Sequence, residues 1–123
     1  MTRSPTPHDR AAAEDRGRRG ETIAAWYLRC KGWRIVATRA RVHGGEVDIV
    51  ARRGRTLAFV EVKWRSTSEA LTFAIDERRL RRVAVAAQTL IEKYATPKDV
   101  TRIDVILLAP GRWPHHLVNV WMS

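Results

Sequence analysis

The sequence predicts an α/β fold in which helices flank a mixed sheet, with the elements in the order helix, three strands, helix, two strands. Apolar residues recur with helical spacing after Gly20 and again within 75–94, and short runs rich in β-branched residues follow each of these stretches. The 123 residues suit one domain. We expect a single domain over 17–123 that follows a flexible arm at 1–16, with no internal repeat.

The arm and the first helix differ in their apolar pattern. The arm, MTRSPTPHDRAAAEDR, holds two prolines and mixed charge without apolar periodicity, and its AAAED stretch is where helix could begin to form. From Gly20 onward, Ile23, Tyr27 and Cys30 recur with helical spacing. Gly32 is placed to end this helix, because glycine adopts the left-handed backbone of a helix C-terminus without steric cost.

The strands and the second helix follow in turn. Three runs rich in β-branched residues predict a β-meander, with RGR as the turn between the last two: WRIVATR (33–39), EVDIVAR (46–52) and LAFVEVKW (57–64). The stretch 75–94 carries an apolar stripe with arginines mostly off it, which predicts an amphipathic helix that ends before Pro97. Two further strand-like runs, RIDVILLA (102–109) and LVNVWM (117–122), complete the sheet.

The charge of the chain indicates what kind of partner it binds. The sequence has 23 Lys and Arg against 13 Asp and Glu, a formal net charge of +10. Such a surplus on a small domain favours a polyanion, either a nucleic acid or an anionic membrane surface. Arginine supplies 19 of the basic residues, and its planar fork grips phosphate bidentately. The codon usage of a GC-rich genome is the alternative explanation for that arginine content.

Composition also excludes several classes of protein. No apolar run approaches the ~20 residues of a membrane helix, and the first ten residues lack the apolar region of a signal peptide. The single Cys30 excludes an internal disulfide and a Cys-cluster zinc site. We therefore expect a cytoplasmic protein that does not associate with a membrane.

Acidic residues inside the predicted strands are the unexpected feature. Alternation puts Glu46 and Asp48 on one face of their strand, and Glu61 and Lys63 on one face of the next. If the intervening turn has an even number of residues, Asp48 lies opposite Glu61, with Cβ atoms ~5 Å apart. Two carboxylates so close repel each other unless a positive charge lies between them. Lys63 or a divalent cation such as Mg²⁺ could supply it; the alternative is a solvated sheet face with ordinary salt bridges.

These residues carry a resemblance to a known family. Asp48 followed by Glu61-Val62-Lys63 on consecutive strands resembles the PD-(D/E)xK nuclease core, the restriction-endonuclease-like fold, and within it the archaeal Holliday-junction resolvases. The chain resembles the small bacterial YraN (UPF0102) family more closely still. The phrases that match, besides a basic helix at 75–94, are GRRGETIAAWYLRCKGWRIV (17–36), GEVDIVAR (45–52), FVEVKWR (59–65) and RIDVILL (102–108).

The resemblance implies roles for individual residues. Asp48 and Glu61 would ligate Mg²⁺ or Mn²⁺ with the backbone carbonyl of Val62. Lys63 would orient the attacking water and favour its deprotonation. Glu21, in the first helix, resembles the additional acid of the resolvase-like branch, which helps to hold the metal or its water.

Two positions depart from the family pattern. This chain has Arg39 where the family usually has Asn, and Arg79 where it often has Lys early in the second helix. Neither change removes an implied metal ligand. The second puts in question an extra catalytic or phosphate-binding lysine.

Arginines near the acids are candidates for binding the nucleic-acid backbone, and for each the alternative is a solvated strand end or helix face. The candidate residues are Arg39, Arg41, Arg52, Arg53, Arg55, Arg65, Arg78, Arg79 and Arg82. Three tryptophans are interpreted most simply as core or interface residues: Trp26, Trp33 and Trp121. Trp64 is a weak candidate for base stacking, and the His115–His116 pair lacks zinc-site spacing. We expect Asp104 to pair with Arg102 or with an arginine of a helix.

Together these features favour a metal-dependent nuclease that hydrolyses phosphodiester bonds of DNA, with branched or single-stranded DNA as candidate substrates. The first alternative is a noncatalytic nucleic-acid-binding module that retains the fold, and the second is a basic protein–protein adaptor. We favour DNA over RNA as the partner. A homodimer is compatible with the sequence, since a resolvase-like nuclease must meet two strands.

Overall fold

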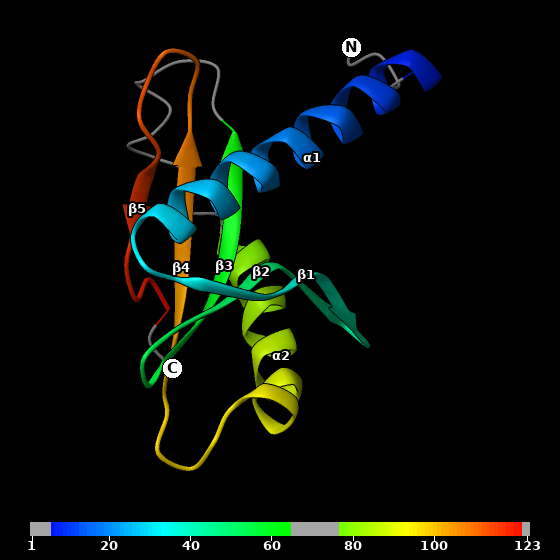
Figure 1. The fold of residues 1–123 in the computed structure, drawn as a ribbon. Coiled ribbons are helices and arrows are strands. Elements are labelled where there is room, and N and C mark those ends of the chain that lie inside the picture. Colours follow the sequence, from blue (N-terminus) through cyan, green and yellow to red (C-terminus); the bar gives the residue numbers. More distant parts are fainter. Residues whose placement is uncertain (1–5, 65–76, 122–123) are drawn as a thin grey trace.

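A computed structural model describes residues 6–64 and 77–121 (Figure 1). Within these residues the elements follow the predicted order: α1 (Pro7–Cys30), β1 (Arg34–Val42), β2 (Gly45–Arg53), β3 (Thr56–Trp64), α2 (Glu77–Tyr94), β4 (Val100–Leu108) and β5 (His115–Leu117). The strands form one five-stranded sheet in the order β1-β2-β3-β4-β5. The β3–β4 pair is parallel and the other pairs are antiparallel, which confirms the predicted mixed sheet. No helix in the described ranges is long and apolar enough to cross a membrane.

Helix α1 begins earlier than the sequence pattern suggests. Residues 7–16, predicted as part of a flexible arm, are its first turns. The Asp9 N–H donates to Thr6 Oγ1 and the Thr6 N–H donates to Asp9 Oδ2, both at 3.0 Å, which forms a capping box. Pro7 is favourable here because the first helical residue needs no N–H donor. Proline therefore starts this helix instead of interrupting it. Gly32, with a φ of +90°, follows the last turn as predicted.

The two helices bury opposite faces of the sheet. Ala24 and Leu28 of α1 pack with Ile49 and Val60 on one face. On the other face, α2 packs with Val50 and Phe59 among other residues. The alternative of a solvated sheet face is therefore wrong for the acid-bearing side of β3, because α2 covers it and Glu61 is only 2% exposed.

Two glycines bring the helices close to the strands that carry the acids. A Cβ at Gly45 would collide with the Arg82 carbonyl oxygen, so β2 can start directly against α2 only without a side chain there. A Cβ at Gly20 would lie 2.5 Å from the indole nitrogen of Trp64. Trp64 therefore packs between α1 and β3, which contradicts its interpretation as a base-stacking residue.

The remaining tryptophans differ in burial. Trp33 is 3% exposed and belongs to the core, as predicted, with the guanidinium groups of Arg53 and Arg102 over its ring. Trp121 packs against the α2 side of the core. Trp26 is 52% exposed, so of its two predicted roles, core or interface, the first is wrong and the second stays a prediction. Its position on α1 follows the helical repeat, which points it away from the buried Ala24 and Leu28.

Candidate functional site

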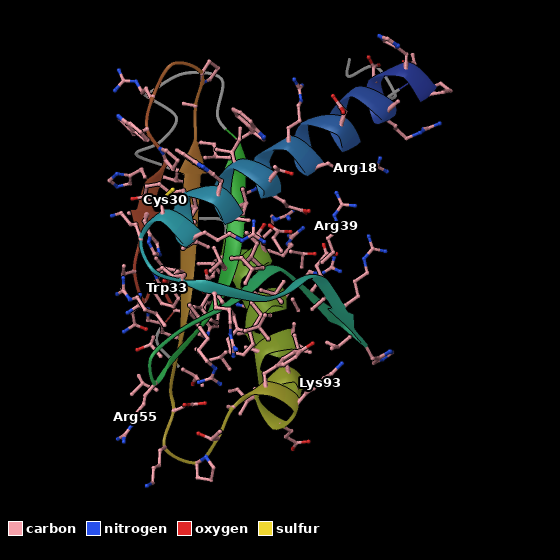
Figure 2. The ribbon with its side chains drawn as sticks, in the orientation of Figure 1. Arg18, Cys30, Trp33, Arg39, Arg55 and Lys93 are labelled. Carbon is pink, nitrogen blue, oxygen red and sulfur yellow. The ribbon has the colours of Figure 1, made fainter. Side chains whose placement is uncertain are left out.

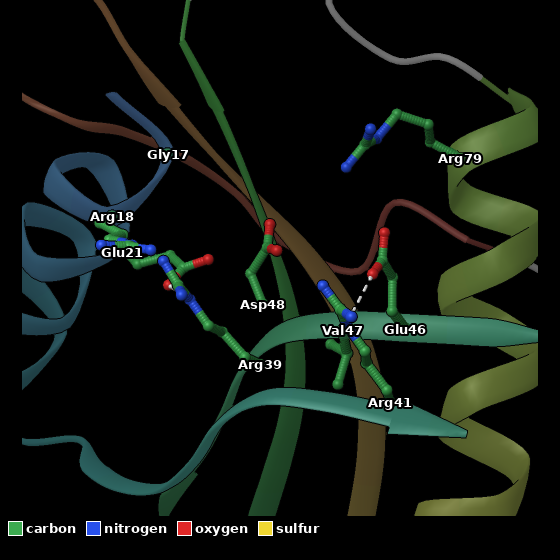
Figure 3. A pocket seen from close by; sticks show the side chains of 9 residues that line it. All are labelled: Gly17, Arg18, Glu21, Arg39, Arg41, Glu46, Val47, Asp48 and Arg79. Atoms are coloured by element: carbon green, nitrogen blue, oxygen red, sulfur yellow. Dashed lines mark hydrogen bonds and ion pairs between the residues drawn. The ribbon is translucent and has the colours of Figure 1, made fainter. Parts of the chain in front are cut away.

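A pocket of about 510 Å³ opens where α1, the β1–β2 pair and the start of α2 meet (Figure 3). Acids and arginines dominate its walls, which are formed by Gly17, Arg18, Glu21, Arg39, Arg41, Glu46, Val47, Asp48 and Arg79. In Figure 3, Asp48 lies between Glu21 and Arg39 on one side and Glu46 and Arg79 on the other. The pocket can thus hold both a cation, at the carboxylates, and a phosphate, at the guanidinium groups.

The β2–β3 hairpin sets the position of Asp48. Its register runs from Arg53↔Thr56 to Ile49↔Val60, so the turn has two residues and meets the condition of an even number. One further step along this register brings Asp48 opposite Glu61. At this position the Asp48 side chain, instead of the backbone, bonds to β3: Asp48 Oδ2 accepts a 2.8 Å hydrogen bond from the Val62 N–H. The bond fixes the orientation of the Asp48 carboxylate beside Glu61.

Glu61 is a buried acid with one unsatisfied oxygen. Its Oε1 accepts from Arg79, at 2.6 Å from Nη2 and 2.8 Å from Nε. Its Oε2 is buried and has no hydrogen-bond partner among the residues that the structure describes. Burial, and then the negative charge of Asp48, raise the pKa of Glu61 to about 7 although Arg79 opposes both. A buried polar atom without a partner is costly, and here a proton or a cation would satisfy it.

Arg79 separates Glu61 from the open pocket. A second cavity of about 30 Å³ is lined by Glu46, Glu61, Arg79, Arg82 and Val83. Glu46 and Arg79 line both cavities. The Arg79 side chain is 44% exposed, so it can leave Glu61 for solvent or for a phosphate without crossing the core. This position is one of the two departures from the family pattern.

The oxygen donors fit a hard divalent ion, with fewer acids than the resemblance implies. Asp48 and Glu61 supply two carboxylates, and Mg²⁺ commonly uses one or two and keeps water for the rest. The described residues contain no group of three or more His, Cys, Asp or Glu side chains that could hold a metal ion. Glu21 lines the pocket but is engaged elsewhere, because its Oε2 accepts a 2.6 Å bond from Arg39 Nε. The two-carboxylate pair is therefore the part of the implied ligand set that the structure brings together.

Arg39 has an unusual backbone conformation. Its φ is +52°, in the left-handed region that non-glycine residues rarely adopt. It lies between the β1–β2 pairs Thr38↔Ile49 and Ala40↔Val47, opposite Asp48. Asparagine adopts this conformation more readily than arginine. Sequence periodicity could not reveal the Arg39–Glu21 pair, because it depends on this local break in the strand.

Lys63 follows Glu61 by two residues on β3, opposite Leu107 of β4, and is half-buried. Strand alternation gives it the same face as Glu61. Its implied role in orienting water stays a prediction.

The predicted phosphate-binding arginines fall into separate groups. Arg39, Arg41 and Arg79 line the pocket together with Arg18, which was not among the predicted residues. The helical repeat could have indicated Arg18, since it precedes Glu21 by three residues. Arg82 lines the smaller cavity and Arg78 is exposed on α2. Arg65 lies outside the described residues.

Three of these arginines lie at the far end of the β2–β3 hairpin instead. Arg52 binds both carboxylate oxygens of Asp99, at 3.0 and 2.8 Å, and the Tyr94 carbonyl at 2.8 Å. Arg53 lies over Trp33, and Arg55 is in the turn. Figure 2 shows Arg55 at the opposite end of the sheet from Arg18 and Arg39. Proximity in sequence to Asp48 was misleading, because the strand carries residues 52–55 away from it by ~3.3 Å per residue.

Asp104 and His116 form a separate structural cluster. Asp104 Oδ2 lies 2.7 Å from His116 Nε2, and its two oxygens also accept from Arg102 and from the Asn119 N–H. This confirms the predicted Arg102–Asp104 pair. Burial would raise the pKa of Asp104, but the hydrogen bonds from His116 and Asn119 outweigh it and lower that pKa. The cluster holds β5 and the chain after it against β4.

Comparisons with known proteins bear on the family and the fold of the chain. The model of the Uncharacterised protein family UPF0102 matches residues 20–108. A UPF0102 protein of Sphingopyxis alaskensis is 64% identical over 112 residues, which are 91% of this chain and 97% of that protein. A UPF0102 protein of Rhizorhabdus wittichii is 60% identical, over 91% of this chain and 95% of that protein. Among solved structures, Hjc, a Holliday junction resolvase of the archaeal hyperthermophile Archaeoglobus fulgidus, matches with a TM-score of 0.58 and 20% identity, over 84% of this chain and 72% of Hjc.

Proposed function

Because the chain belongs to the UPF0102 family and has the restriction-endonuclease-like fold of a Holliday junction resolvase, we propose that it is a divalent-metal-dependent nuclease that cleaves DNA. The observation that carries the proposal is the Asp48–Glu61 pair, in which Glu61 Oε2 is buried without a partner among the described residues. A buried oxygen of this kind, beside a second carboxylate and an arginine-lined pocket, suits a cation that meets a phosphate.

In the proposed mechanism Asp48 and Glu61 would hold Mg²⁺ or Mn²⁺ together with the Val62 carbonyl. When bound, the ion supplies charge neutralisation at the scissile phosphate and makes a coordinated water more acidic. The Val62 N–H fixes the Asp48 carboxylate through its 2.8 Å bond. Lys63 would orient the attacking water from the same face of β3.

The pocket arginines would bind the DNA backbone on either side of the cleaved bond. Arg18, Arg39 and Arg41 stand on α1 and β1 around Asp48. Glu21 orients Arg39 through their 2.6 Å bond. Such phosphate contacts are independent of base sequence and weaken with added salt. Arg79 would exchange its bond to Glu61 for a phosphate oxygen as the ligand enters.

A noncatalytic nucleic-acid-binding module remains the second candidate. The Arg79–Glu61 ion pair favours it, because that pair neutralises Glu61 without a metal. The two candidates differ in their response to chelation. A binding module keeps its DNA affinity in EDTA and is indifferent to the loss of the Asp48 charge.

The test is cleavage of labelled single-stranded, duplex and branched DNA in Mg²⁺ or Mn²⁺. We expect wild-type cleavage that EDTA stops and that Asp48→Asn lowers by ~10³-fold or more, with Lys63→Met lower by ~10²-fold. Glu77→Gln, which changes an exposed acid at the start of α2, is the matched control and keeps full activity. Salt-sensitive binding without cleavage of any of these DNAs would contradict the nuclease and support the binding module.

A further inference from the structure

We propose that Trp26 and Trp113 form a stacking platform for an unpaired base of the nucleic-acid ligand. This inference deepens the proposed function, in that it takes the ligand to be a nucleic acid and narrows it to one with unpaired bases. It concerns a surface outside the pocket and requires no metal.

The two indoles are exposed and parallel. Trp26 of α1 is 52% exposed, and Trp113, in the β4–β5 loop, is 76% exposed. Their ring centroids are 6.5 Å apart and their planes differ by 9°. Ile23, one turn before Trp26, is also exposed. Exposed large apolar side chains gathered in one place mark a binding surface, because water solvates them poorly.

The loop holds Trp113 in this position. The Arg112 N–H donates to the Ala109 carbonyl at 3.2 Å, and Gly111 adopts a left-handed φ of +70°. Pro114 follows directly and restricts the backbone of Trp113 to extended conformations. A preorganised ring loses little conformational freedom when a base stacks on it.

The surrounding charge favours a nucleic acid as the occupant. Arg112 precedes Trp113, and Arg29 follows Trp26 by three residues on α1, so both guanidinium groups can reach a backbone that passes the indoles. The chain as a whole carries a net charge of +10. Aromatic rings beside arginines are how proteins bind single strands without sequence preference: the rings stack on bases and the arginines contact phosphates. Bases within a duplex are already stacked on each other, so the platform selects unpaired ones.

The platform lies on the same helix as one wall of the pocket. Arg18 and Glu21 line the pocket, and Trp26 is five residues beyond Glu21, which is ~7.5 Å along the helix axis. The helical repeat turns Trp26 to another side of α1. A strand that leaves the pocket and passes around α1 would meet the indoles.

The test is the affinity of dye-labelled oligonucleotides, measured by fluorescence anisotropy in EDTA so that no cleavage occurs. The probes are an oligothymidine single strand and a blunt hairpin duplex. We expect Trp113→Ala and Trp26→Ala to weaken single-strand binding about tenfold and to change duplex binding less than twofold. Trp113→Phe should restore most of the affinity, whereas Trp113→Leu, which keeps apolar area without a π face, should not. Trp113 is exposed, and an unchanged melting temperature verifies that the variants fold.

Three outcomes would overturn the platform: unchanged single-strand affinity in both alanine variants, an equal loss on the duplex, or full rescue by leucine. Self-association of the wild type that Trp113→Ala abolishes without a change in DNA affinity would assign the surface to a second copy and also overturn it. Cleavage is scored separately. Absence of cleavage with an intact tryptophan effect refutes the nuclease alone, and normal cleavage without a tryptophan effect refutes the platform alone.

Discussion

Two buried acids, Glu61 on β3 and Asp104 on β4, lie on neighbouring strands and have opposite environments. Both are at most 2% exposed. Asp104 accepts hydrogen bonds on both oxygens, and its pKa is lowered. Glu61 has an oxygen without a partner in the described part of the chain, and its pKa is raised to about 7. Asp104 thus has the properties of a structural acid, and Glu61 those of an acid in a functional site.

The difference arises from which face of the sheet each acid occupies. Asp104 pairs with Val60 and shares its face, where α1, Trp33 and His116 surround it. Glu61, one residue later, points to the α2 face, where Asp48 adds a second negative charge and Arg79 binds Glu61 Oε1. One step along β3, from Val60 to Glu61, thus changes the face of the sheet. On the first face the hydrogen bonds of the buried acid Asp104 are satisfied, and on the second those of Glu61 are not.

Asp104→Asn should be the most destabilising change. It removes the charge that Arg102 and His116 share inside the fold, and we expect a loss on the order of 3 kcal/mol in the free energy of unfolding. Urea denaturation at pH 8 in EDTA measures it. Glu61→Gln, the matched change at the other buried acid, should leave the free energy of unfolding unchanged or raise it under the same conditions. Equal destabilisation by both variants would refute the contrast.

The two acids should shift stability in opposite directions with pH. The Glu61 pKa is raised from 4.5 to about 7, so its contribution to stability is full below 4.5 and is lost as the pH rises through 7. In EDTA, Glu61→Gln should therefore gain stability relative to wild type between pH 4.5 and 8, by about 3 kcal/mol. The lowered pKa of Asp104 gives the reverse: its contribution is present above its unfolded pKa and falls as the solution is acidified.

Denaturation curves of wild type, Glu61→Gln and Asp104→Asn across pH 3–8 test this opposition. The stability difference between wild type and Glu61→Gln must change between pH 4.5 and 8. If this stability difference is constant, Glu61 is ionised at neutral pH as an ordinary acid, and its environment does not favour a bound cation.

Arg79→Ala should strengthen metal binding. The guanidinium is the cation that now occupies Glu61 Oε1 at 2.6 Å, and its side chain is 44% exposed. Its removal should raise Mn²⁺ affinity by about fivefold, in line with the ~1 kcal/mol of a partly exposed ion pair. Arg78→Ala, the neighbouring exposed arginine, is the control. Weaker Mn²⁺ binding in Arg79→Ala would show that Arg79 supports the site instead of competing for it.

The smallest effect is expected at Arg39. Arg39→Asn loses the 2.6 Å bond to Glu21 but relaxes a left-handed backbone, so the two effects nearly cancel and stability changes by less than about 1 kcal/mol. Arg39→Val loses the same bond and cannot relax, because β-branched residues strongly disfavour a positive φ. In denaturation experiments Arg39→Val should therefore be less stable than Arg39→Asn. Equal stability of the two variants would contradict a strained backbone.

The sequence predicted the order of the elements and the mixed sheet, because these depend on apolar periodicity alone. It placed Asp48 opposite Glu61 only on the condition of an even turn, which the structure has. It did not predict which arginines bind Glu61 and Glu21. The Arg79–Glu61 and Arg39–Glu21 pairs join residues 18 positions apart and depend on how the helices sit against the sheet. Local composition was also misleading at Pro7, which starts α1, and it left open whether Trp26, which is exposed, lies in the core or at an interface.

Calorimetric titration of Mn²⁺ at pH 8 tests the central claim, that Asp48 and Glu61 form a cation site, most directly. We predict saturable binding of Mn²⁺ to the wild type, at least tenfold weaker binding in Asp48→Asn and Glu61→Gln, and unchanged binding in the exposed control Glu77→Gln. Absence of binding to the wild type, or binding that survives the loss of both Asp48 and Glu61 charges, would contradict it.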